Sequence, residues 1–582
     1  MPRFLYRLSG FLLCFFFAGV YTAQVLGLAG IYRAWGVFPL TLALTGLALW
    51  LYFRHDGGRF FESFPQEMDF PRWLNLLLYG LGLGLFLLLV AYPVAAWPYS
   101  TVSETLHWDA GAYHFPKAVE LYKHGHVWDL SIPYGEFPFG YEAMLAFALL
   151  LTGKETFFGA LHALIALLVF LTLWLLGRRY TRLPGGLLLF VVAGIFLSES
   201  LVVKGNPFYI FLDQADMIGK NDLFLAMGVL AALIHAPLGR EASSSRLHFP
   251  GLVFATLLVL ATKPAGMFVV TPLWFPVIWG WVKSWRELRR LPWQEVALAA
   301  VLIIPGGLWV VRNLIVIGTI FPEGVWVMNE WSMANNLTNP FFYQHLPRNL
   351  IFLMGMLGVT WLFTLWKGVP GWRISLAFSI LVVAFFFTPE SGFQKTTQEP
   401  TRTAWRLGIA VVGYEVVVIL TLLSGAVNRI LKWADRQWLG RAGLAGVAIV
   451  LALGLVWNAR GRLALNPFNE IVLRDEFRHP VGVDGYHSAY DYVQRNIRNS
   501  VIEITGGVFY YMYGPGFTNT PTKLQYPLGR ADRVVHPEPE YQVIIPHGDP
   551  FDPSAEWRAR WKLIYQDPEG LVFIRRDLAP AP

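Results

Sequence analysis

A short polar segment holds the residues of this chain that are best suited to chemistry. It reads His107-Trp108-Asp109-Ala110-Gly111-Ala112-Tyr113-His114-Phe115-Pro116 and directly follows an apolar run over 73–97. Asp109 is a carboxylate that could deprotonate a hydroxyl group as a general base, and its aromatic neighbours favour a position near lipid headgroups. The alternative is that Asp109 caps the helix expected from Tyr113 to Lys123. The two histidines, seven residues apart, are only a weak metal signal, so we expect His107 and His114 to contact a substrate.

Cationic residues recur at the ends of later apolar runs. Each could simply reach from a helix end to water. Positive groups gathered near one carboxylate would instead suit a phosphate, to which arginine offers two-pronged contacts. We therefore predict phosphate contacts for Lys220, Lys263, Arg312, Arg402 and Arg406. The other predicted substrate contacts, besides the two histidines, are Tyr113, Glu136, Asp222 and Asn313.

The composition places these residues in a membrane protein. The chain has 582 residues, 55% hydrophobic and 15% charged, with a mean hydropathy of +0.45. Soluble proteins carry about 25% charged residues, and the apolar blocks here approach the roughly 20 residues that cross a bilayer. The net charge of +7 is spread over short connections, which favours topology and lipid contact over nucleic-acid binding. The single cysteine, Cys14, excludes an intrachain disulfide.

Thirteen apolar runs predict a polytopic α-helical membrane protein. They cover 8–31, 36–53, 73–97, 157–177, 184–203, 222–238, 248–262, 266–282, 294–311, 349–366, 373–388, 405–427 and 442–458. Arginine and lysine clusters fall on every second connection, which marks the cytoplasmic side and places the amino terminus there. The long connections 98–156, 204–221, 312–348 and 389–404 then lie outside, together with residues 459–582.

Three stretches leave alternatives open. The first apolar run could be a signal peptide, although its length favours a retained helix. The pair 248–262 and 266–282 could be two short helices or one kinked helix. The run 140–153 is too short to span and could lie along the membrane interface.

The carboxyl-terminal stretch changes character after about residue 466. SAYDYVQRNI has the pattern of an amphipathic helix, and VIEITGG, EYQVIIPHG, WKLIYQD and GLVFIRR have the pattern of short strands. The alternation predicts a small extracytoplasmic α/β domain over 459–582, which would serve packing or acceptor docking.

Several motifs together resemble bacterial glycosyltransferases of the GT-C superfamily. HWDAGAYHFPKAVELYKHG is similar to their first external loop, in which an Asp is followed by Tyr-His-x-Pro and a helix. GKNDLFLAMGVLAAL, ATKPAGMFVVTPL and PGGLWVVRNLIVIGTIFP continue the resemblance in order, the last being similar to Trp-x-x-Arg-Asn…Gly-x-x-x-x-Pro. The resemblance runs from about Trp73 to the end and is most like the protein mannosyltransferase and aminoarabinose transferase branch.

This resemblance implies a GT-C-like transmembrane core over 73–458, with a catalytic external loop at 98–156. Residues 1–54 would be an extra helical hairpin. The loop lacks the paired acidic residues of some members, which argues against a metal, and we expect no cofactor.

The implied activity is transfer of a sugar from a polyprenyl-phosphate carrier to a glycan, lipid or protein acceptor, with inversion. It would take place at the outer face of the cytoplasmic (inner) membrane of the cell envelope. Asp109 would be the base, and Lys220, Lys263 and Arg312 would offset the charge of the departing phosphate. The alternatives are a lipid-linked oligosaccharide polymerase or ligase, a lipid or solute transporter, and a structural membrane subunit. A transporter would favour internal repeats and ionisable residues near the midplane, neither of which the sequence suggests.

Overall fold

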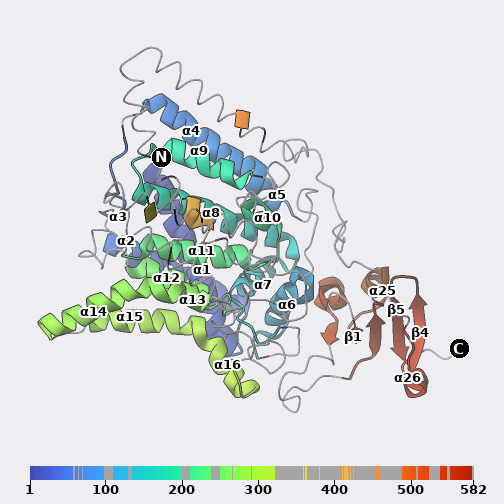
Figure 1. Ribbon diagram of the computed structural model, residues 1–582. Coiled ribbons are helices and arrows are strands. Elements are labelled where there is room, and N and C mark those ends of the chain that lie inside the picture. Colours follow the sequence, from blue (N-terminus) through green and yellow to red (C-terminus); the bar gives the residue numbers. More distant parts are fainter. Residues whose placement is uncertain are drawn as a thin grey trace.

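The protein, seen here as a computed structural model, is a bundle of apolar helices beside a small carboxyl-terminal sheet domain (Figure 1). The structure describes residues 1–56, 59–62, 64–68, 70–97, 109–128, 134–198, 210–237, 249–264, 266–289, 292–320, 488–505, 509–522, 538–546 and 551–579, and single positions between 355 and 457.

Long apolar helices make up the amino-terminal two thirds of the described chain. Their bounds are α1 Pro2–Leu28, α2 Ala34–Asp56, α3 Arg59–Glu62, α4 Arg72–Phe86, η1 Leu87–Ala91, α5 Tyr92–Ala95, α8 Phe158–Tyr180, α9 Gly185–Phe196, α10 Ile210–Asp216, α11 Asp222–His235, α12 Phe249–Leu260, α13 Gly266–Val270, η7 Thr271–Trp274, α14 Phe275–Leu288, α15 Trp293–Ile303, η8 Ile304–Gly307 and α16 Leu308–Val316. Within the described ranges, five stretches are long and apolar enough to cross a membrane: Pro2–Leu28, Ala34–Arg54, Arg72–Ala95, Glu155–Tyr180 and Trp293–Val316. The chain is thus a multi-pass membrane protein.

The early apolar runs predicted from the sequence coincide with these helices. The run 248–262 and the run 266–282 are separate helices, because the chain breaks between Leu260 and Gly266 and again through the 3-10 turn η7. The runs 349–366, 373–388, 405–427 and 442–458 lie largely outside the described residues, so the total of thirteen stays a prediction.

Helices α1 and α2 pack against each other as a hairpin. Helix α1 also packs against α7, α8 and α12, and its side chains Cys14, Phe16 and Val20 are fully buried. The first helix is therefore part of the centre of the bundle, and its standing as an addition to a GT-C-like core stays a prediction.

The short run at 140–153 also behaves differently from its prediction. Helix α7, Gly140–Thr152, is followed by the 3-10 turn η4, Glu155–Phe157. Residues 140–149 are all buried, and α7 packs against α1 and α6, where α6 is Phe115–His124. Over these residues the helix is part of the core rather than a helix lying along the membrane interface, and only its last turn is partly exposed.

The carboxyl-terminal domain is a mixed five-stranded sheet. The strands are β1 Val501–Thr505, β2 Thr520–Thr522, β3 Tyr541–Ile544, β4 Trp561–Gln566 and β5 Leu571–Arg575, with helices α25 Ser488–Asn496 and α26 Ala555–Arg560 and turns η10 Phe509–Tyr513 and η11 Pro515–Phe517. The strand order is β2-β1-β3-β5-β4. Strand β1 pairs in parallel with β2 and β3, and β5 pairs antiparallel with β3 and β4. The predicted helix and four predicted strands are confirmed. Strand β2 was missed, since its sequence Thr-Pro-Thr has no strand pattern.

Candidate active site

Asp109 opens an unusual turn. Residues Ala110–His114 form a single π-helical turn, η3, which runs directly into α6. Single π-helical turns are rare in proteins, and those that do occur are often found at functional sites. The backbone of Asp109 is already helical and its side chain makes no capping hydrogen bond. The capping alternative therefore does not describe this carboxylate.

The partner of Asp109 is Lys220. The lysine Nζ lies 3.5 Å from Asp109 Oδ2. The Lys220 side chain is 2% exposed, whereas that of Asp109 is 18% exposed. Two sequence candidates separated by more than a hundred residues thus meet, and the carboxylate of the pair stays within reach of a solute.

Gly219 allows this close approach. Its φ of +92° lies in a region that side-chain-bearing residues rarely adopt, and a Cβ there would stand 2.4 Å from the Cβ of Ala110. The segment before α11 can therefore lie directly against the turn that carries Asp109 only because this position has no side chain.

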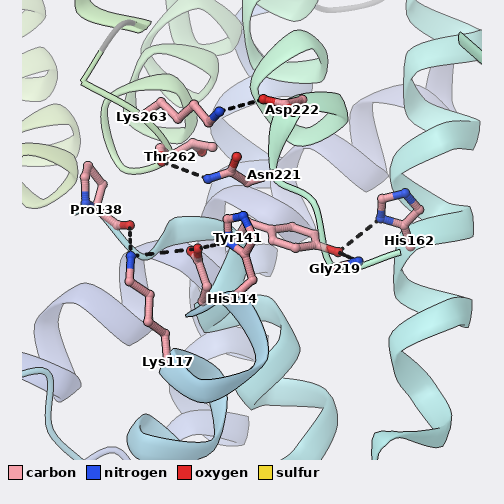
Figure 2. A network of polar contacts seen from close by, with 11 residues as sticks. His114, Lys117, Pro138, Tyr141, His162, Gly219, Asn221, Asp222, Thr262 and Lys263 are labelled. Atoms are coloured by element: carbon pink, nitrogen blue, oxygen red, sulfur yellow. Dashed lines mark hydrogen bonds and ion pairs between the residues drawn. The ribbon is translucent and has the colours of Figure 1, made fainter. Parts of the chain in front are cut away.

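A chain of hydrogen bonds holds the backbone of Gly219 in place (Figure 2). The Gly219 N–H donates to the Tyr141 hydroxyl over 3.0 Å, which is 3.1 Å from His162 Nδ1. His162 Nε2 in turn lies 3.0 Å from the Gln214 carbonyl oxygen. That carbonyl can only accept, so Nε2 carries the proton, and Nδ1 accepts from the tyrosine. The relay joins α7, α8 and α10 to the backbone next to Lys220.

A second ion pair lies one helix end further on. Lys263 Nζ is 2.6 Å from Asp222 Oδ1, and the Asn221 amide points toward the Thr262 carbonyl at 3.5 Å. Asp222 is 4% exposed and Lys263 is 20% exposed. The pair ties the start of α11 to the end of α12, with the ammonium as its more accessible member (Figure 2).

Beneath Asp109 lies a buried charged cluster. His114 Nδ1 donates to Glu142 Oε1 over 2.5 Å, and Lys117 Nζ lies 4.0 Å from the same oxygen. Lys117 also donates to the Pro138 carbonyl at 3.3 Å. Burial lowers the pKa of His114 below its usual range, against the pull of Glu142. Burial likewise lowers the pKa of Lys117 to about 8.

Arg312 already has partners within the protein. Its side chain is 2% exposed, and its guanidinium donates to the carbonyls of Val127 and Phe137 and to Asn313 Oδ1 at 3.0–3.3 Å. Most of its N–H groups thus already have acceptors in the protein, and its phosphate contact stays a prediction. Asn313, predicted to contact substrate, instead donates to the carbonyls of Glu136 and Ile320 at 2.8 and 2.7 Å.

These two residues hold the loop that carries Glu136. The Glu136 side chain is 0% exposed, and within the described part of the chain its carboxylate oxygens have no partner other than the backbone of Glu136 itself. Burial raises its pKa, and the positive charges of Lys117 and Arg312 offset only part of that rise. Tyr113, in η3, packs its ring edge-on to Tyr134 of this loop at 4.7 Å.

Three sequence candidates, His107, Arg402 and Arg406, lie outside the described residues. Within the described part of the chain, no group of three or more His, Cys, Asp or Glu side chains is placed to hold a metal ion. The sequence did not point to Lys117, Tyr141, His162 or Gly219 as members of the site. His162 had a usable signal, because an ionisable residue inside an apolar run needs a partner.

Comparisons with known proteins give a weak structural similarity. No protein-family model matches the chain, and no curated protein matches it. The structure is similar to that of the arabinosyltransferase EmbB from Mycobacterium smegmatis, with a TM-score of 0.31 and 16% sequence identity over 66% of this chain. The chain spans about a third of that protein's length, 33%. A similarity this low does not assign a function, which must come from the site itself.

Proposed function

We propose that the protein is a membrane glycosyltransferase with a GT-C-like fold, which uses a polyprenyl-phosphate-linked sugar. The observation that carries the proposal is the Asp109–Lys220 pair, a partly exposed carboxylate 3.5 Å from a buried ammonium. A base for the acceptor and a cation for the donor phosphate are the two groups that this reaction needs. The motif resemblance over the same segments supports the same reaction class.

In the proposed reaction Asp109 accepts the proton of an acceptor hydroxyl. The oxygen of that hydroxyl attacks the anomeric carbon, and the bond from this carbon to the phosphate oxygen breaks as the new glycosidic bond forms. The electron pair leaves with the polyprenyl phosphate, and the proton passes from Asp109 to water. Attack opposite the leaving group inverts the anomeric centre.

Lys220 and Lys263 would compensate the charge of the departing phosphate. Lys220 precedes helix α11, and Lys263 follows helix α12. Each ammonium group lies beside the carboxylate of an aspartate. An ammonium that is already oriented needs little rearrangement when charge develops nearby, which is the source of most electrostatic catalysis. Asp222 would then act by orienting Lys263, since its carboxylate is almost fully buried.

The site would face the outer side of the cytoplasmic membrane, with the polyprenyl chain between apolar helices. The alternation of basic clusters supports this side. The acceptor would be a hydroxyl of a glycan, a lipid or a protein. His107, Arg402 and Arg406 stay predicted contacts of the donor or acceptor.

Asp109→Asn tests the base and Lys220→Met tests the phosphate contact. The variants are compared in nanodiscs with a panel of undecaprenyl-phosphate sugars, and with undecaprenyl phosphate alone as the binding probe. Asp109→Asn should lower transfer by about 10²–10⁴-fold while it keeps binding of the probe. Lys220→Met should weaken binding by about 1.5–3 kcal/mol, the range for a charge-assisted hydrogen bond.

Lys283→Met is the matched control, because Lys283 is 64% exposed on α14 and pairs only with the neighbouring Glu287. It should leave both transfer and binding unchanged. Near wild-type transfer by Asp109→Asn would show that Asp109 is not the base. Binding and movement of the lipid across vesicles without any transfer would favour the transporter alternative.

A further inference from the structure

One helix connects the candidate base to the carboxyl-terminal domain. The backbone is helical without a break from Asp109 through η3 and α6. It ends at Gly125, whose φ of +74° is the left-handed conformation that closes many helices. A shift of α6 along or across its axis therefore shifts Asp109 as well.

The carboxyl-terminal domain contacts this helix through an aromatic segment, η10 and η11. Tyr513 is fully buried, and its hydroxyl donates to Glu120 Oε1 over 2.5 Å. The same hydroxyl lies 3.4 Å from the Pro116 carbonyl oxygen. Glu120 is itself 5% exposed, so this is a buried hydrogen bond to a carboxylate, one of the stronger kinds.

Packing contacts surround that bond along α6. The ring of Tyr510 meets Phe115 edge-on at 5.1 Å, and the ring of Phe517 meets Tyr122 at 6.1 Å. Lys123 Nζ donates to the Asn519 carbonyl at 2.5 Å and lies 5.4 Å from the centre of the Tyr513 ring. Side chains from the first turn of α6 to its last are thus in contact with residues 510–519.

The other end of the chain holds α6 as well. Arg33, in the connection from α1 to α2, donates to the carbonyls of Tyr122, Lys123 and His124 at 3.3, 3.0 and 3.2 Å. A cation on the last carbonyls of a helix satisfies acceptors that have no partner within the helix. Arg33 therefore holds the carboxyl end of α6, and the carboxyl-terminal domain contacts the helix along its length.

We propose that the carboxyl-terminal domain positions the catalytic base, with Tyr513 and Glu120 as the positioning residues. The proposal rests on the proposed role of Asp109. Neither residue touches a substrate. They act through α6, because their contacts hold this helix in the position in which Asp109 lies beside Lys220. Displacements of about 1 Å can cost roughly 10²-fold in rate even when they start far from the chemistry.

Tyr513→Phe tests this, because it keeps the ring packing and removes only the hydroxyl. The expected result is a fall in kcat of about 10-fold or more, with the KM for the lipid-linked donor within about twofold of wild type. Tyr565→Phe is the matched control. Tyr565 in β4 also donates to a carboxylate, Asp567 Oδ2 at 2.7 Å, and β4 packs against β5, α25 and α26.

Glu120→Gln and Glu120→Ala separate positioning from charge. Glutamine keeps an oxygen that can accept from Tyr513, so Glu120→Gln should stay near wild type. Glu120→Ala also removes the pair with His124 Nε2 at 2.9 Å, so it should lose at least as much as Tyr513→Phe, and the double variant should be no worse than Glu120→Ala. Additive losses would overturn the idea that the two residues act as one contact.

Amide hydrogen exchange without substrate keeps this proposal independent of the proposed function. Peptides that cover 109–124 should exchange faster in Tyr513→Phe and at the wild-type rate in Tyr565→Phe. Unchanged exchange in Tyr513→Phe would overturn the positioning role whatever the activity. Faster exchange in Tyr513→Phe, combined with no sugar transfer by the wild-type protein, would support the coupling of the carboxyl-terminal domain to α6 and contradict the proposed glycosyltransferase activity.

Discussion

Two carboxylates of the site, Asp109 and Glu136, have opposite surroundings. Asp109 is partly exposed and lies beside the ammonium of Lys220. Glu136 is fully buried, and no other described residue makes a hydrogen bond to its carboxylate. A reacting base must meet its substrate, so the exposed carboxylate fits that role, while the buried one is a cost that the fold carries.

Glu136→Gln should therefore stabilise the protein at neutral pH. Burial raises the folded-state pKa of Glu136 above its unfolded value of roughly 4.3. The folded state thus takes up a proton between these two values, and stability falls as the pH rises through that window. Glutamine has the same shape without the charge. The thermal midpoint at pH 7.5 should rise by roughly 1 °C for each kcal/mol gained, because the shift per kcal/mol falls with chain length.

The pH dependence is the discriminating part of this measurement. The gain should shrink as the pH falls and vanish below the unfolded pKa, where the glutamate is neutral in both states. A gain that is equal at pH 4 and pH 7.5 would show that packing rather than charge is responsible.

At the scale of elements, the site is a junction of helix ends. The turn η3, the start of α11 and the end of α12 each contribute one charged residue or more. The start of α11 at Asp222 and the end of α12 at Leu260 lie close to the ends of the predicted runs 222–238 and 248–262, because a polar border marks an apolar run well. The pairing of Asp109 with Lys220 and of Asp222 with Lys263 was not predictable, because one sequence gives no distances between separate helices.

Arg312 shows the same limit more clearly. Its place at the end of an apolar run was visible in the sequence, and its partners were not. The carbonyls that it binds belong to residues 127 and 137, which carry no side-chain signal at all. An arginine that binds backbone and one that binds phosphate look alike until the chain is folded.

Gly219→Ala tests the contact between two of these elements. The new methyl group would overlap Ala110, and the φ of +92° would strain any residue but glycine. We expect a lower thermal midpoint and loss of transfer, because the Asp109–Lys220 distance must grow. Gly280→Ala in α14 is the control, since nothing lies within 4 Å of its added Cβ and alanine favours a helix. Equal stability of the two variants would contradict the close contact.

At the scale of the whole molecule, η10 contacts α6, so we expect the sheet domain and the Asp109 turn to lie on the same side of the membrane. The basic clusters predict that this is the outer side. Ser554→Cys, with Cys14 replaced, should react with an impermeant maleimide on intact cells. Lys283→Cys, in a basic cluster on the predicted cytoplasmic side, should react only after lysis. The reverse pattern would invert the topology and place the site inside.

The buried bond between Tyr513 and Glu120 joins residues 393 positions apart. A ribosome that adds about 5–20 residues per second needs roughly 20–80 s to make that stretch. Through this interval the helix that bears Asp109 is already synthesised but lacks one of its supports. A chain that stalls before residue 513 would keep the Arg33 contacts of α6 and lack those of Tyr513. On the proposed roles, such a copy would reach the membrane with its base poorly positioned and would transfer little sugar.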